Sequence, residues 1–139
     1  HITTIRLLSS SGSTKPIETL QQGDRVLAYD EPTAMTKPAE VVRVRPPYVV
    51  DHYFVINQRI RITEFHPVLS RGKWVAVGEL KIGDALTGSD GAETPILSIQ
   101  RVEETVKVYN IQVTTGTYVA HGIVVHNKED CEIYYQYYQ

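Results

Sequence analysis

The sequence predicts an all-β domain, and three observations support this. Its apolar residues fall in short runs, many of them β-branched, and Gly, Pro, Asp or Ser separates one run from the next. No window shows the apolar spacing of an amphipathic helix. Runs of this length and spacing predict roughly seven to ten short strands in a single domain.

The expected strands, in chain order, lie at residues 25–29, 41–44, 53–56, 59–63, 94–99, 106–113 and 123–125. Residues 17–22 and 77–82 are each long enough for one helical turn. Segments 30–38 and 88–93 are rich in the turn-forming residues Gly, Pro, Asp and Thr, so we expect exposed hairpin loops there.

Composition narrows the function classes. With 139 residues, 42% of them hydrophobic, the chain can form one domain that buries roughly two-thirds of its unfolded surface. A net charge of −2 gives no electrostatic reason to expect nucleic acid or an anionic membrane as partner. No apolar run is long enough to span a membrane and no signal peptide opens the sequence, so we expect a soluble domain or an excised piece of a larger protein.

Two echoes within the chain predict an internal duplication. Residues 20–27 and 80–87 share the pattern Leu-x-x-Gly-Asp followed by a strand. In such a turn Gly permits a positive φ and Asp can accept hydrogen bonds from the turn's own amides. A second echo links residues 54–56 to residues 109–111. Together they predict a pseudo-two-fold fold.

The end of the last expected strand carries a candidate reactive bond. His126 precedes Asn127, and an Asn side-chain amide can attack its own carbonyl, form a succinimide and cut the chain before Lys128. Alternatively, Asn127 is a turn residue that ends a strand, where Asn is favoured. The remaining residues, 128–139, are charged and then almost entirely Tyr and Gln, which predicts a disordered or loosely packed extension.

The chain resembles the Hint family, the self-processing domains of inteins, bacterial intein-like proteins, pre-toxin processing domains and Hedgehog proteins. The resemblance covers residues 1 to about 128 and rests on the order and spacing of four segments, namely residues 15–27, Thr63-Glu64-Phe65-His66-Pro67-Val68, residues 72–84, and Val125-His126-Asn127.

This resemblance implies a horseshoe-like all-β fold whose two chain ends meet in one central cleft. It implies a processing domain at 1–127 and a flanking segment at 128–139. In the family, a Cys or Ser at the first position attacks the preceding carbonyl, and Thr63 and His66 match the pair that polarises that bond. Asn127 matches the cyclising Asn. His126 matches the His that assists it, either by protonating the departing amine or by polarising the Asn127 carbonyl.

Two departures from the family pattern restrict the chemistry. His1 stands where the family has its nucleophile, and imidazole has no route to a stable acyl shift with its own backbone nitrogen. Lys128 stands where splicing requires Cys, Ser or Thr, and a protonated ammonium is a poor acyl acceptor. Ligation of the flanking segments is therefore not expected, and Thr63 and His66 could hold the cleft geometry without chemistry.

A third departure concerns assisting groups. The family commonly has an Asp at the position of Asn110 and a His at the position of Gly116. Both groups are absent here, unless His121 takes over from a neighbouring position.

The other notable side chains are assigned simpler roles. The five histidines show no paired metal-ligand spacing, so we expect neither metal nor cofactor. Cys131 is the only cysteine, which excludes an internal disulfide and leaves the cellular compartment open. We interpret it as an exposed thiol without a role, and Trp74 as a core aromatic residue.

We therefore expect a single-turnover, self-cleaving domain in which Asn127 cyclises and the Asn127–Lys128 bond breaks. It would act in cis on its own flanking segments, as a monomer, within a larger secreted or surface protein. Two alternatives stay open. In the first, the chain is a splicing intein trapped as a precursor by replacement of its first residue. In the second, it is a degenerate Hint module with a structural or binding role.

Overall fold

The computed structural model describes residues 4–6 and 13–127, and almost all of the regular structure is β-strand. The all-β prediction is confirmed, although the sixteen strands in these residues exceed the expected seven to ten. The strands are β1 (Thr4–Arg6), β2 (Thr14–Pro16), β3 (Arg25–Asp30), β4 (Met35–Val44), β5 (Tyr48–Val50), β6 (Tyr53–Ile56), β7 (Ile60–Ile62), β8 (Pro67–Ser70), β9 (Lys73–Ala76), β10 (Ala85–Thr87), β11 (Glu93–Pro95), β12 (Ile99–Val102), β13 (Val106–Val108), β14 (Ile111–Val113), β15 (Thr117–Ala120) and β16 (Ile123–His126), and the 3-10 turns are η1 (Ile17–Thr19) and η2 (Val77–Glu79).

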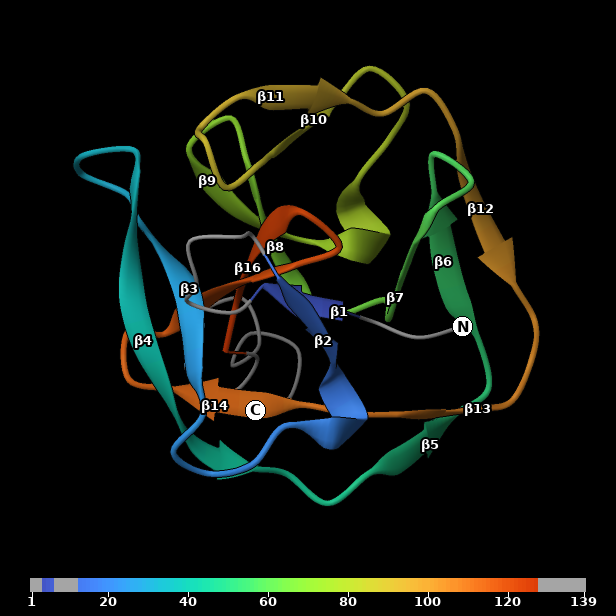
Figure 1. The fold of residues 1–139 in the computed structure, drawn as a ribbon. Helices are drawn as coiled ribbons and strands as arrows, with labels where there is room; N and C mark the ends of the chain where they lie inside the picture. The colour runs from blue at the N-terminus through green and yellow to red at the C-terminus, as the bar shows by residue number, and fades with distance from the viewer. Residues whose placement is uncertain (1–3, 7–12, 128–139) are drawn as a thin grey trace.

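A central sheet lies inside an open ring of smaller sheets (Figure 1). The central sheet has six strands in the order β2-β1-β15-β16-β8-β9. The ring is formed by β10-β11, β12-β6-β7, β13-β5 and β14-β4-β3, and the strand pairs in both parts are antiparallel. This arrangement is the expected horseshoe.

The innermost strands are buried on both faces, because the ring covers the central sheet. All four residues of β15 are buried, as are Ile123, Val124 and Val125 of β16. Alternation is lost in such strands, since neither face meets water. The C-terminal end of β16 is thereby fixed in the middle of the molecule, which is where the candidate reactive bond follows.

The two Leu-x-x-Gly-Asp turns have the same geometry. Gly23 has a φ of 95° and Gly83 a φ of 98°. In each turn the Asp carboxylate accepts a hydrogen bond from the amide three residues earlier, at 2.9 Å for Asp24 and 3.0 Å for Asp84. A 3-10 turn precedes each copy, η1 the first and η2 the second. This agreement in conformation supports the predicted duplication.

The two halves exchange strands. In one half Ile56 of β6 pairs with Ile99 of β12, and in the other Ile111 of β14 pairs with Val44 of β4. Each residue of the first pair lies fifty-five positions from its counterpart in the second, since 56 maps to 111 and 44 maps to 99. Each of these four strands therefore pairs with a strand from the opposite half of the sequence.

Several predicted boundaries differ from the structure. The run at 94–99 is divided between β11 and β12, and the run at 106–113 between β13 and β14. The first hairpin loop is shorter than 30–38, because β3 continues to Asp30 and β4 begins at Met35. The 3-10 turns are also shorter than the predicted helical turns at 17–22 and 77–82.

His1, Lys128, Cys131 and the Tyr/Gln tail lie outside the described residues. No helix in the described part of the chain is long and apolar enough to cross a membrane.

Candidate functional site

Asn127 follows β16 directly and is held by three hydrogen bonds. Its backbone amide donates to the Gly116 carbonyl at 2.6 Å. Its side-chain Oδ1 accepts from the Val113 amide and its Nδ2 donates to the Val113 carbonyl, both at 3.1 Å. The side-chain amide thus both accepts from and donates to Val113, at the end of β14, in the way that the backbone of a neighbouring strand would. Because Asn127 is only 2% exposed, water does not compete for these bonds.

His126 contacts the carbonyl that the Asn127 side chain would attack. Its Nδ1 lies 2.9 Å from the Asn127 carbonyl oxygen. A carbonyl oxygen can only accept, so Nδ1 carries the proton in this contact. The imidazole ring stands edge-on to Trp74, with ring centroids 4.8 Å apart at 87°. On another side lies Gly116, where an added Cβ would be 3.4 Å from His126 Cε1.

Thr63 and His66 form one tight turn between β7 and β8. The His66 amide donates to the Thr63 carbonyl at 3.2 Å, which closes the turn. Two further bonds tie the turn to η2: the Val77 amide donates to the His66 carbonyl, and the Gly78 amide to the Glu64 carbonyl. The motif is therefore fixed by backbone bonds within its own part of the chain.

The strand register brings the two motifs to the same end of one strand pair. Val68 of β8 pairs with Val125 of β16 in the central sheet. His66 lies two residues before Val68, and Asn127 lies two residues after Val125. Since the strands are antiparallel, both residues leave the pair at the same end. Residues about sixty positions apart in sequence thus lie at one end of the same strand pair.

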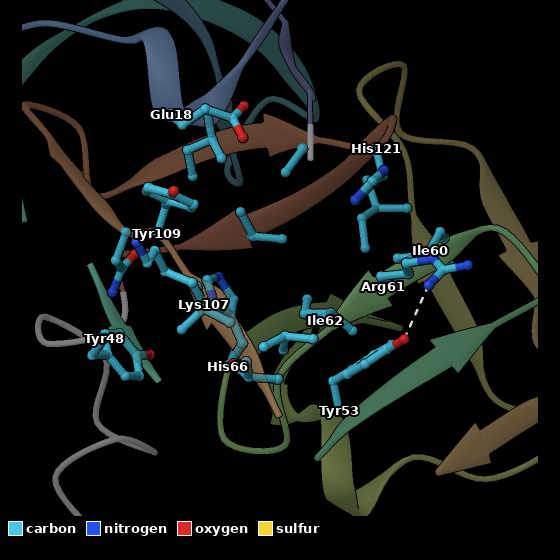
Figure 2. Close-up of a pocket in the computed structure, with 18 of the residues that line it drawn as sticks. Glu18, Tyr48, Tyr53, Ile60, Arg61, Ile62, His66, Lys107, Tyr109 and His121 are labelled. Carbon is cyan, nitrogen blue, oxygen red and sulfur yellow. Dashed lines mark hydrogen bonds between the residues drawn. The ribbon is translucent and has the colours of Figure 1, made fainter. Parts of the chain in front are cut away.

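A cleft of about 170 Å³ opens beside this site, with Thr63, His66 and Asn110 in its wall. Figure 2 shows His66, Lys107 and Tyr109 gathered on one side and His121 and Arg61 on the other. Arg61 donates to the Tyr53 hydroxyl at 3.0 Å. The wall combines apolar strand residues with charged and aromatic side chains.

His121 does not replace the missing groups near Asn127. It lies in the turn between β15 and β16 with a φ of 53°, and its carbonyl accepts a bond from Arg59 at 2.9 Å. The whole of β16 separates it from Asn127, roughly 13 Å of extended chain. Burial lowers the pKa of His121, and the nearby Arg59 and Arg61 lower it further. The imidazole of His121 is therefore neutral at neutral pH. Its place in the β15–β16 turn puts it on the far side of the cleft.

The two departures at 110 and 116 differ in their surroundings. Asn110 is buried, and its Oδ1 accepts from the Ile111 amide at 3.1 Å. Gly116 has a φ of 79°, in the left-handed region that favours glycine. A residue with a side chain is therefore strained at position 116.

Two features of the site were not predicted from sequence. Val113 holds Asn127 through backbone atoms, and nothing in the identity of a valine signals that role. Trp74 was interpreted as a core aromatic residue, and it does pack against a small cluster of Tyr29, Leu69 and Val124. Its contact with His126 adds a role that spacing alone does not reveal.

The fold and this placement of motifs define the class of protein. The strand arrangement is that of the Hint superfamily, whose members are autoprocessing or splicing domains. Within it, the model of the pretoxin HINT domain matches residues 7–128, and the chain belongs to that family. A search of curated proteins finds no match.

Solved structures agree. The chain is similar to a bacterial intein-like domain from Clostridium thermocellum, at 27% identity and a TM-score of 0.79, over 90% of this chain and 94% of that one. It is also similar to a DnaB intein from Synechocystis sp., at 27% identity and a TM-score of 0.74, over 90% of this chain and 94% of the other. The resemblance found in the sequence is thereby confirmed.

Proposed function

We propose that residues 1–127 form a single-turnover, self-cleaving domain that cuts the bond between Asn127 and Lys128 and releases the segment that follows. The observation that carries this proposal is the 2.9 Å contact between His126 Nδ1 and the Asn127 carbonyl oxygen. It supplies a donor at the atom where negative charge develops during attack. Membership of an autoprocessing family supports the same conclusion.

The reaction needs no added reactant. Asn127 Nδ2 attacks the Asn127 carbonyl carbon and the bond to the Lys128 nitrogen breaks. The proton lost by Nδ2 is balanced by the one gained at the departing amine. The products are a C-terminal succinimide and a free amine on Lys128. His126 Nδ1–H stabilises the oxyanion, so the contact favours carbonyl polarisation over protonation of the leaving group as its role.

Val113 has two opposing effects on this step. Its carbonyl accepts an N–H of Asn127 Nδ2, which increases electron density on the attacking nitrogen. The paired bond to Oδ1 holds the side chain against the rotation that attack requires. The resting arrangement is therefore ordered but restrained, and slow cleavage is expected.

The absence of the family's Asp and His at positions 110 and 116 determines how slow the cleavage is expected to be. A half-life of about two hours corresponds to a barrier near 23 kcal/mol at room temperature. Loss of one acid–base group at a cost of about 10²–10⁴ in rate extends this to between roughly a week and years. An intact precursor can then be isolated.

His1 and Lys128 limit what else the domain does. Without Cys or Ser at position 1, the N-terminal acyl shift is blocked, and Thr63 and His66 maintain the cleft geometry. Without Cys, Ser or Thr at position 128, no acyl acceptor follows the cut. Cleavage without ligation is the chemistry that these residues leave.

Intact mass spectrometry of the purified chain over days at neutral pH tests the proposal. Asn127→Ala and the nearly isosteric Asn127→Asp serve as controls, because both lack the attacking nitrogen. A fragment ending at Asn127 and lighter by one water than its hydrolysed form is expected from the unaltered chain only. The incubation is continued for months, because a half-life of years leaves only about 1% of the chain cut in ten days. No fragment after that time, with the fold intact, contradicts the proposal.

A trapped intein is the second candidate, favoured by the similarity to a DnaB intein and opposed by Lys128. It predicts that His1→Cys, with a short segment added before residue 1, forms a thioester that an added thiol cleaves. If neither this variant nor the unaltered chain is processed, the domain is a degenerate Hint module.

A further inference from the structure

Trp74 connects the reactive end of β16 to a distant hairpin. One edge of its indole meets the β3–β4 turn, where Nε1–H donates to Glu31 Oε1 at 2.9 Å. The ring also packs against His126 in a T-shaped arrangement, with centroids 4.8 Å apart. A side chain from β9 therefore joins Glu31 to His126, and neither partner is close to it in sequence.

The position of the His126 ring decides whether its Nδ1 reaches the Asn127 carbonyl. Imidazole is attached through a torsion with a broad energy well, so its ring plane is set by its neighbours. Trp74 bounds the ring on one side, and Gly116 leaves it room on another, since an added Cβ there would lie 3.4 Å from Cε1. These contacts select the rotamer seen here.

The Glu31 end of the connection is itself braced. Asp30 accepts hydrogen bonds from Thr33 at 2.7 Å and from Lys37 at 3.1 Å, across the same turn. The turn is thus a fixed support for the Trp74 indole, although its residues are exposed.

We propose that Trp74, anchored by Glu31, is a positioning residue that holds the His126 imidazole against the Asn127 carbonyl. This inference rests on the proposed function. It extends that function by giving the β3–β4 turn a part in controlling the cleavage rate. Trp74 touches none of the reacting atoms and acts through His126.

A double-mutant cycle separates positioning from general packing. Trp74→Leu is expected to slow cleavage about two- to tenfold, the range that corresponds to loss of one aromatic pair. In a His126→Ala background the same change should have no further effect, because the group it positions is gone. An equal slowing in both backgrounds overturns the proposal.

Milder variants keep the test decisive if Trp74→Leu fails to fold. Trp74→Phe keeps a ring beside His126 but removes the donor to Glu31, and Glu31→Ala removes the acceptor. Glu31→Gln, which keeps an acceptor oxygen, should restore the rate lost in Glu31→Ala. Glu93→Ala, on the exposed strand β11, is the matched control and should leave the rate unchanged.

An NMR measurement in the non-cleaving Asn127→Ala background does not depend on cleavage at all. The cross-relaxation peak between the His126 ring and the Gly116 α-protons should weaken in Glu31→Ala and persist in Glu93→Ala. If the unaltered chain never cleaves but this peak responds as stated, the proposed function fails and the positioning contact stands. A peak unchanged in Glu31→Ala and Trp74→Phe overturns the positioning role.

Discussion

Asn127 illustrates what can and cannot be learned from single residues. The pair His126–Asn127 is visible in the sequence, because the chemistry depends on what those two side chains are. Its restraint by Val113 is not visible, since the bonds are made by backbone atoms that every residue possesses. The same holds for Trp74, whose partners are brought together only by folding.

The positions that lack assisting groups are expected to differ in whether they can be restored. Asn110→Asp keeps the oxygen that accepts from the Ile111 amide and adds an ionisable group at the cleft wall. It should speed cleavage by about 10²–10⁴-fold, the range typical of an acid–base group. Gly116→His should not, because its φ of 79° and its closeness to His126 make a side chain there strained.

Cleavage rates of the two variants, measured by intact mass at neutral pH, check this contrast. Urea unfolding of each variant serves as the control for lost structure. Equal rates for Asn110→Asp and the unaltered chain would show that the cleft-wall position does not contribute to the reaction.

Among the elements, the two duplicated turns should lose equal amounts of stability when their glycine is replaced by alanine. Gly23→Ala brings the new Cβ to 4.0 Å from a Glu40 oxygen, and Gly83→Ala meets nothing within 4 Å. The cost in each case is therefore the left-handed backbone itself, about 1–2 kcal/mol. Urea unfolding should give matching losses in the two variants. A difference of several-fold would mean that the turns are not equivalent.

A histidine between two carboxylates ties the Thr63–His66 turn to the β5–β6 connection. His52 Nδ1 lies 2.6 Å from Asp51 and its Nε2 lies 2.6 Å from Glu64, so both ring nitrogens donate when the ring is charged. The hydrogen bonds to Asp51 and Glu64 raise the pKa of His52, against the smaller opposing effects of burial and of Arg101. Arg101 also lies 3.9 Å from Glu64, and Phe54 packs edge-on to the ring.

A raised pKa in the folded state has a definite consequence for stability. The stabilisation from charged His52 is fully present below its unfolded value, near 6.5, and is lost as pH rises through the higher folded value. The free energy of unfolding should therefore fall more for the unaltered chain than for His52→Gln over the pH range that begins at the unfolded value and extends through the higher folded pKa. Urea titrations across that range measure it, and parallel curves for the two proteins would contradict the assignment.

The strands that the sequence predicted are those with a simple pattern. The runs at 25–29 and 53–56 correspond closely to β3 and β6. Strands β1, β2, β5, β8, β9 and β15 were missed. β15 is buried throughout and shows no alternation, and the prolines and glycines around β8 and β9 resemble a loop. The candidate site was predicted from its two motifs, while the placement of those motifs at one end of a strand pair depends on β8, which was not predicted.

For the whole molecule, the exchange of strands means that each half lacks the partners of several of its strands. β4, β6 and β8 come from the first half, and they pair with β14, β12 and β16 of the second. Fragments divided between Arg71 and Gly72, in the turn between β8 and β9, should each lack stable structure alone. Mixed together, they should give the dispersed NMR spectrum of the intact domain. A dispersed spectrum from either fragment by itself would contradict this.

The position of β16 in the central sheet also governs timing during synthesis. It is the last described strand to leave the ribosome, and its pairing with β8 and β15 places Asn127 at the site. Until then His126 has no fixed ring plane and the Asn127 amide has no strand end to bond. The candidate cleavage site is therefore not assembled while the domain is being translated. Any segment that follows is already joined to it when the proposed cleavage becomes available.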